Sequence, residues 1–142
     1  MKIRATLLSA LLATAVTVPA VAQDWPDLVG TWKGTTRAVV ANAGGHYADA
    51  GSDDAGTFAT AELTIEWTEA DNGRYIGTIS SPQYTERVLA VVSSDGQSIF
   101  TVDSDGLTIG RLMDEDRFEL CYLQSSSADT QMAASCVEFE RQ

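Results

Sequence analysis

Short apolar runs alternate with tight turn signals along this chain, and their spacing is the strongest constraint on its fold. Runs of β-branched and aromatic residues are separated by clusters of Gly, Asp, Asn and Ser, and no run keeps a 3.6-residue helical period. The expected strands span residues 28–40, 58–68, 74–80, 84–92, 98–103, 107–113, 117–124 and 132–141. Strands joined in sequence by hairpins predict an all-β, eight-stranded antiparallel up-and-down β-barrel, because closure removes the sheet edges.

The last two expected strands also indicate their own register. Cys121 and Cys136 are the only cysteines of the chain, and we expect them to form a disulfide. Placing them opposite each other pairs Leu120 with Val137 on the inward face and leaves both sulfur atoms on the outer face. Two separate buried thiols are the alternative.

The N-terminal segment is typical of a secretory signal peptide spanning residues 1–22. It has a basic start, an apolar run over 5–18 and the small residues Ala20-Val21-Ala22 at its end. A transmembrane anchor is the alternative, although the apolar run is short for a membrane span. Residues 23–142 are then a single β-barrel domain, which we expect in the periplasm or outside the cell. Such an oxidising compartment favours the disulfide.

The charge balance excludes several classes of partner. The chain has 20 acidic and 9 basic residues, a net charge of −11. Such a chain repels phosphate backbones and anionic lipid surfaces, so we expect no nucleic-acid and no membrane partner. One His and two Cys are too few for a zinc site built from those ligands, and we expect neither a metal nor a cofactor.

One connection, residues 41–57, is much longer than the other turns, and it contains His46 and Tyr47. Connections of this length are usually functional or disordered, so it is either a lid over a barrel mouth or a passive insert. His46 is the only His, and a catalytic base on a mobile Gly-rich segment would lack a fixed position. Because no other catalytic constellation is recognisable, we expect the protein not to be an enzyme.

The strand expected at 84–92 contains a continuous apolar run from Val88 to Val92. A run of this kind fits a strand buried on both faces. The long connection or a second subunit would then cover its outer face, which makes a homo-oligomer an open possibility.

The first expected strand contains Gly30-Thr31-Trp32, and this Gly-x-Trp resembles the opening strand of the calycins. That group comprises lipocalins and avidins, which are small-ligand-binding eight-stranded barrels. The resemblance implies that Trp32 closes one barrel end, where an arginine near the last strand covers it. Arg141 occupies that position, and its guanidinium is expected to stack on the indole.

A second stretch, Gly77-Thr78-Ile79-Ser80-Ser81, is similar to the third strand of avidins. The resemblance places Ser81 where avidins use a serine to bind biotin. At the three other biotin-binding positions this chain has Gly34, Ala38 and Ile79. Without those partners the polar atoms of biotin would stay unpaired, so the resemblance favours a lipocalin/avidin-like barrel and argues against biotin.

These features predict an exported, non-enzymatic barrel that binds one small, largely apolar ligand in its interior. The candidate interior residues are Trp32, Leu63, Ile65, Trp67, Ser81, Phe118, Tyr122 and Phe139. Alternatively, the same side chains fill the barrel completely. The protein would then be a protein-binding module, an inhibitor or assembly partner, that uses the 41–57 connection or the outer surface of strand 84–92.

Overall fold

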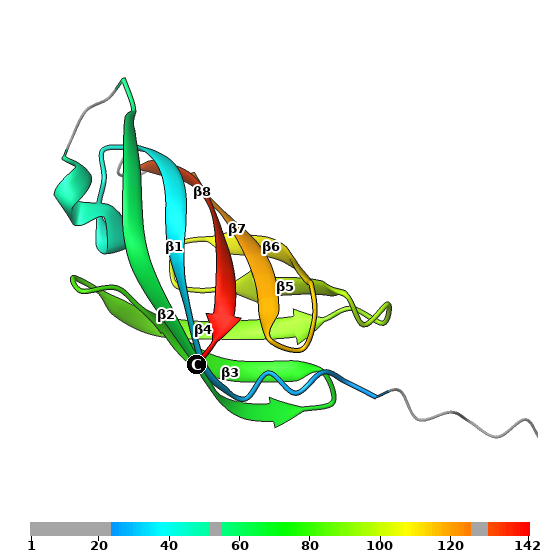
Figure 1. Ribbon diagram of the computed structural model, residues 1–142. Coiled ribbons are helices and arrows are strands. Elements are labelled where there is room, and N and C mark those ends of the chain that lie inside the picture. Colours follow the sequence, from blue (N-terminus) through cyan, green and yellow to red (C-terminus); the bar gives the residue numbers. More distant parts are fainter. Residues whose placement is uncertain (1–23, 52–54, 126–130) are drawn as a thin grey trace, which may run out of the picture.

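The computed structural model describes residues 24–51, 55–125 and 131–142, and these form a closed antiparallel barrel (Figure 1). Each strand pairs with its neighbour in sequence, and the last strand pairs back with the first. The strands are β1 (Gly30–Ala41), β2 (Thr57–Asp71), β3 (Arg74–Ser80), β4 (Thr85–Val92), β5 (Ser98–Val102), β6 (Leu107–Leu112), β7 (Arg117–Ser125) and β8 (Met132–Arg141). The predicted eight-stranded up-and-down barrel is therefore confirmed.

The described residues begin at Asp24, after the N-terminal segment. The signal peptide predicted at 1–22 lies outside the described residues. In the described part of the chain, no helix has the length and apolar character needed to cross a membrane.

The hairpin turns use the residues that their backbone angles require. Between β2 and β3, Asn72 and Gly73 have φ values of 49° and 75°. Positive φ at two central positions suits the Asn-Gly pair, because Asn tolerates this region and Gly has no Cβ to clash. The turn matches the right-handed twist of the flanking strands.

The predicted disulfide is present between Cys121 and Cys136, which face each other across β7 and β8. The same register pairs Leu120 with Val137, as the sequence predicted. Leu120 and Val137 are buried inside the barrel, whereas the cysteines point outward and are half-buried. The disulfide therefore joins the last hairpin from outside the core.

One end of the barrel is closed by aromatic side chains. Trp32 is fully buried there, and its indole lies 4.8 Å from the ring of Phe118, measured between ring centroids. The guanidinium carbon of Arg141 lies 4.2 Å from the centroid of the Trp32 ring, which is the stack that the calycin resemblance implied. Arg141 also donates hydrogen bonds to the carbonyls of Asp27 and Val29, so it ties the N-terminal segment to this end.

Inward side chains become smaller toward the other end of the barrel. Along β1 the inward residues change from Trp32 to Thr36 and Ala38, and along β8 from Phe139 to Ala133. On β2 the inward series runs from Trp67 through Ile65, Leu63 and Ala61 to Ala59. The aromatic end is filled by side chains of the strands themselves, whereas at the opposite mouth the small residues make room for Tyr47 of the long connection.

The expectation that β4 is buried on both faces by the long connection is wrong. Val88, Ala90 and Val92 point into the core, but Leu89 and Val91 are 44% and 46% exposed. The described part of the 41–57 connection packs against β2 and meets β4 at Glu86, so it leaves Leu89 and Val91 uncovered. The continuous apolar run therefore combines a core face with an apolar outer face. Coverage of this face by a second subunit remains a prediction.

Candidate functional site

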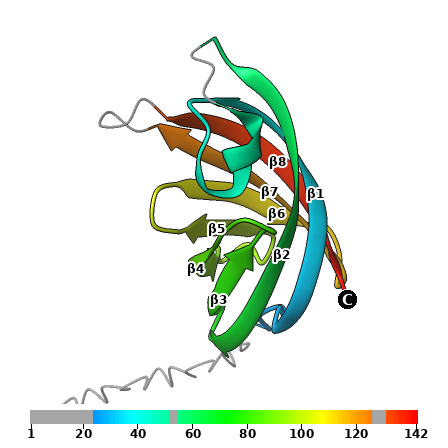
Figure 2. The same cartoon turned by 90° about the vertical axis from the view of Figure 1, so that its left-hand side faces the viewer.

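Residues 44–47 of the long connection lie over the mouth of the barrel. The connection contains a 3-10 helix, η1 (Gly45–Ala50), which lies at that end of the barrel (Figure 2). Tyr47 is buried, and its hydroxyl lies 3.2 Å from Oγ1 of Thr36. On the outer side, Nε2 of Gln83 donates a hydrogen bond of 2.6 Å to Oδ2 of Asp49. These contacts attach η1 to the barrel.

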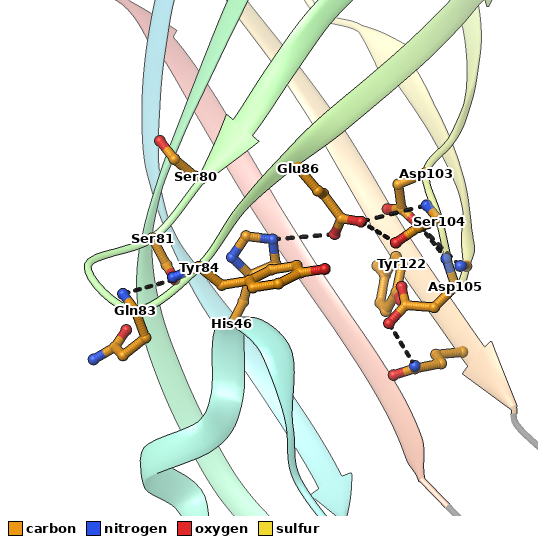
Figure 3. Close-up of polar contacts among 12 residues, drawn as sticks. His46, Ser80, Ser81, Gln83, Tyr84, Glu86, Asp103, Ser104, Asp105 and Tyr122 are labelled. Carbon is orange, nitrogen blue, oxygen red and sulfur yellow. Dashed lines mark hydrogen bonds and ion pairs between the residues drawn. The ribbon is translucent and has the colours of Figure 1, made fainter. Parts of the chain in front are cut away.

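His46 extends from η1 into the mouth, next to Tyr84 and Glu86 (Figure 3). Its Nε2 lies 3.4 Å from Oε1 of Glu86, and its ring meets that of Tyr84 edge-on at 5.1 Å. Neither ring nitrogen has a hydrogen-bond partner among the described residues. Burial lowers the pKa of His46, although the negative charge of Glu86 opposes this shift. The histidine is therefore mainly neutral at pH 7.

Glu86 is held from its other side by the turn between β5 and β6. Its Oε2 accepts hydrogen bonds from the backbone N–H and the hydroxyl of Ser104. The glutamate side chain is only 8% exposed, so it is a buried carboxylate whose two oxygens face different partners. Glu86 thus connects η1 to the β5–β6 turn.

The same turn places two aspartates at the mouth. Asp103 Oδ1 accepts a 2.8 Å hydrogen bond from the backbone N–H of Gly106, which closes the turn. Asp105 accepts a 2.7 Å hydrogen bond from the hydroxyl of Tyr122. A Cβ at Gly106 would lie 2.2 Å from the Tyr122 ring, so the close approach of this ring requires glycine at that position.

Three carboxylates are therefore close together: one oxygen each from Glu86, Asp103 and Asp105 lie within 4.8 Å of one another. Burial raises the pKa of Asp103, and the charge of Glu86 adds to this effect. Burial, followed by the hydrogen bond to Asp105, raises the pKa of Tyr122, which stays protonated. The three groups could contribute to a hard-cation site, but Ca²⁺ prefers six to eight oxygens. All three carboxylates already accept protein hydrogen bonds.

Below this rim lies a cavity of about 50 Å³. Its floor consists of inward apolar side chains from several strands: Leu63, Ile65, Ile79, Val88, Leu120, Val137 and Phe139. A cavity of this volume accommodates a few water-sized groups, since one water molecule needs about 10–15 Å³. The arrangement can accept a small molecule whose apolar part lies on the floor and whose polar end meets the rim.

The candidate residues from the sequence separate into three groups. The cavity lining includes Leu63, Ile65, Tyr122 and Phe139, together with His46 and Tyr47 of the predicted lid. Trp32, Trp67 and Phe118 pack instead in the core at the closed end. Ser81 lies in the β3–β4 turn, where its Oγ accepts hydrogen bonds from the backbone N–H groups of Gln83 and Tyr84.

Sequence reasoning missed the acidic rim. Glu86 was not among the expected site residues, although it points to the same inward face of β4 as Val88 and Ala90. Asp103 and Asp105 carry the ordinary chemistry of a hairpin turn, and the sequence does not show that this turn lies beside the lid. Strand alternation could have identified Glu86 as an inward acidic residue. The position of Asp103 and Asp105 beside it is visible only in the three-dimensional structure.

Comparisons with known proteins add little to this geometry. No protein-family model matches the sequence, and no curated protein matches it. Among solved structures, a redesigned β-barrel is similar, with 10% sequence identity and a TM-score of 0.43. That similarity covers 81% of this chain and 91% of the redesigned barrel.

The lowered pKa of His46 predicts a pH-dependent stability. The unfolded chain has a histidine pKa near 6.5, above the folded value, so the unfolded state takes up a proton first as the pH falls. The free energy of unfolding should therefore fall as the pH drops below about 6.5, by at most about 1.4 kcal/mol per pH unit from one site. Urea unfolding at several pH values between about 7.5 and about 5 should show this slope.

The control for this experiment is His46→Gln, which keeps a polar side chain but does not titrate. Asp103 has a raised pKa and acts with the opposite sign, since the folded state binds its proton first. The difference between wild type and His46→Gln isolates the histidine. Equal slopes for the two proteins would contradict the assignment of a buried, neutral His46.

Proposed function

We propose that this protein is an exported, non-enzymatic barrel that binds a small, largely apolar ligand at the barrel mouth. The observation that carries the proposal is the cavity between the apolar floor and η1, which His46 and Tyr47 line from the lid side. Small pockets with an apolar wall and a few convergent polar groups are the usual form of ligand sites. Because the cavity is small, a ligand larger than a single ring requires η1 to move.

The rim determines which polar end such a ligand carries. Glu86 and Asp105 are hydrogen-bond acceptors, and Tyr84 and Tyr122 present aromatic rings beside them. A protonated amine donates hydrogen bonds to carboxylates, whereas a carboxylate ligand would be repelled. The favoured ligand therefore has an apolar body and a cationic, hydrogen-bond-donating end.

Binding without catalysis is supported by the way the rim groups pair with one another. The hydroxyl of Ser104 donates a hydrogen bond to Glu86 and not to His46, so this hydroxyl has no histidine base beside it. His46 faces the same glutamate from the opposite side. His46 lies on the docked η1 and not on a mobile segment, so its lack of a hydroxyl partner replaces mobility as the reason against catalysis. Export is supported by the N-terminal sequence and by the Cys121–Cys136 disulfide.

Titration with three matched probes tests this proposal. Benzylamine, benzyl alcohol and benzoate share one apolar ring and differ in the charge of the polar end. NMR chemical-shift titration should show benzylamine binding about tenfold or more tightly than benzyl alcohol, because a charge-assisted hydrogen bond is worth ~1.5–3 kcal/mol. Benzoate should bind most weakly. Glu86→Gln should reduce the preference for the amine while keeping the binding of the alcohol.

A matched pair of substitutions on β2 locates the binding. Leu63 lines the cavity, whereas Glu66 is exposed on the outer face of the same strand and away from η1. Leu63→Trp fills the cavity and should abolish binding of all three probes, and Glu66→Trp should leave it unchanged. Circular dichroism checks that both variants are folded. Wild type that binds none of the probes, or equal binding by a folded Leu63→Trp, would refute the proposal.

A further inference from the structure

The outer wall formed by β3 to β7 has an almost continuous apolar surface. We call it the outer apolar face, and it consists of Ile76, Leu89, Val91, Phe100, Val102, Leu107, Ile109 and Leu123. Each of these side chains is between 43% and 52% exposed. Most outer positions of a barrel in water are polar, so this face is unusual.

Strand pairing makes these side chains neighbours rather than scattered residues. In one row, Leu89 pairs with Val102, which pairs with Leu107. In the adjacent row, Phe100 pairs with Val91 on one side and Ile109 on the other. Ile76 and Leu123 extend the first row to β3 and β7, so this row crosses five strands, whereas the adjacent row crosses three. Facing residues on paired strands lie in contact, so the two rows form one continuous apolar surface on β4, β5 and β6.

The area of this face exceeds that of a typical monomer. Eight half-exposed large side chains provide roughly 650 Å², whereas the largest apolar patch on a monomer is roughly 300–600 Å². A standard protein interface buries about 800 Å² on each partner. The face alone therefore supplies most of the area that a stable dimer needs.

The border of the face carries both signs of charge. Arg74, Arg87 and Arg111 lie on its edges, on β3, β4 and β6, and all three are exposed. Arg74 pairs with Asp71, and Arg111 lies 3.4 Å from Glu119. In a chain with a net charge of −11, this mixed border repels a second copy less than a uniformly acidic border would.

We propose that the outer apolar face is the interface of a homodimer, in which β4, β5 and β6 of two copies pack face to face. A two-fold axis brings the same patch of both copies together, and a uniformly apolar surface is complementary to itself. Strand addition is not available, because the barrel is closed and the paired strands leave no edge. This proposal is independent of the ligand site, since none of the eight residues lines the cavity.

Sedimentation velocity of the full chain, over a wide range of concentrations, tests this interface. Wild type should be dimeric, and added salt should strengthen the dimer because it screens the repulsion between two acidic chains. Val102→Glu places a charge in the centre of the face and should raise the dimer dissociation constant about a hundredfold or more. Thr60→Glu adds the same charge on the exposed face of β2 and should leave the dimer intact.

Ile109→Glu on the neighbouring strand gives a second variant if Val102→Glu fails to fold, and circular dichroism identifies folded variants. Dimeric wild type that becomes monomeric with either folded variant supports the interface. Monomeric wild type at every concentration overturns the proposal. A dimer that survives a folded Val102→Glu or Ile109→Glu also overturns it, because the copies would then meet elsewhere.

Discussion

Trp32→Ala should lower the free energy of unfolding by about 3–5 kcal/mol, the range found when large aromatic side chains are removed from cores. Trp32 is fully buried at the closed end of the barrel, and its Nε1 donates a 2.9 Å hydrogen bond to the carbonyl of Leu28. The substitution removes this hydrogen bond, the contact with Phe118 and the platform for Arg141. A domain has only about 5–15 kcal/mol of stability, so the loss is severe.

Phe58→Ala is the matched control for this experiment. Phe58 is also an aromatic residue of a barrel strand, but its side chain is 89% exposed. Its removal should change the stability by less than about 0.5 kcal/mol. Urea unfolding, followed by circular dichroism, measures both variants. A loss below about 1.5 kcal/mol for Trp32→Ala would contradict its role as the plug of the closed end.

The fold was accessible from the sequence because strand alternation and turn chemistry are local signals. Cys121 and Cys136 were decisive, since placing them opposite each other also paired the inward residues Leu120 and Val137. The outer face of β4 was not accessible in the same way. An apolar residue such as Leu89 has the same pattern whether it is covered or exposed, and only the three-dimensional arrangement shows that it is exposed.

The candidate site was accessible only in part. The decrease in side-chain size from Trp32 to Ala38, which makes room for Tyr47, can be read from alternate positions of the sequence. The position of His46 depends on how η1 docks, and its neighbours Glu86 and Asp105 come from distant segments. Loop docking is determined by many weak contacts of residues far apart in sequence, so local patterns do not predict it.

Removing the disulfide by Cys121→Ser together with Cys136→Ser should lower the free energy of unfolding by about 3 kcal/mol in the chain-entropy model. The cysteines are separated by 15 residues and lie on the outer face of the β7–β8 hairpin. Because their sulfur atoms are outside the core, removal leaves no core cavity, and the main effect is greater freedom of the unfolded chain. Urea unfolding of both forms measures the difference.

The double variant with Cys121→Ala and Cys136→Ala tests whether the polarity of serine contributes to the loss. If the covalent link alone matters, the serine and alanine double variants should lose similar stability. Neither cysteine lines the cavity, so the affinity of both double variants for benzylamine should stay within about twofold of wild type. A stability loss below about 1 kcal/mol would mean that the unfolded chain keeps the two positions close together even without the disulfide. A large change in affinity would mean that the link positions the mouth as well, because Tyr122 follows Cys121 directly and its hydroxyl donates to Asp105 at the rim.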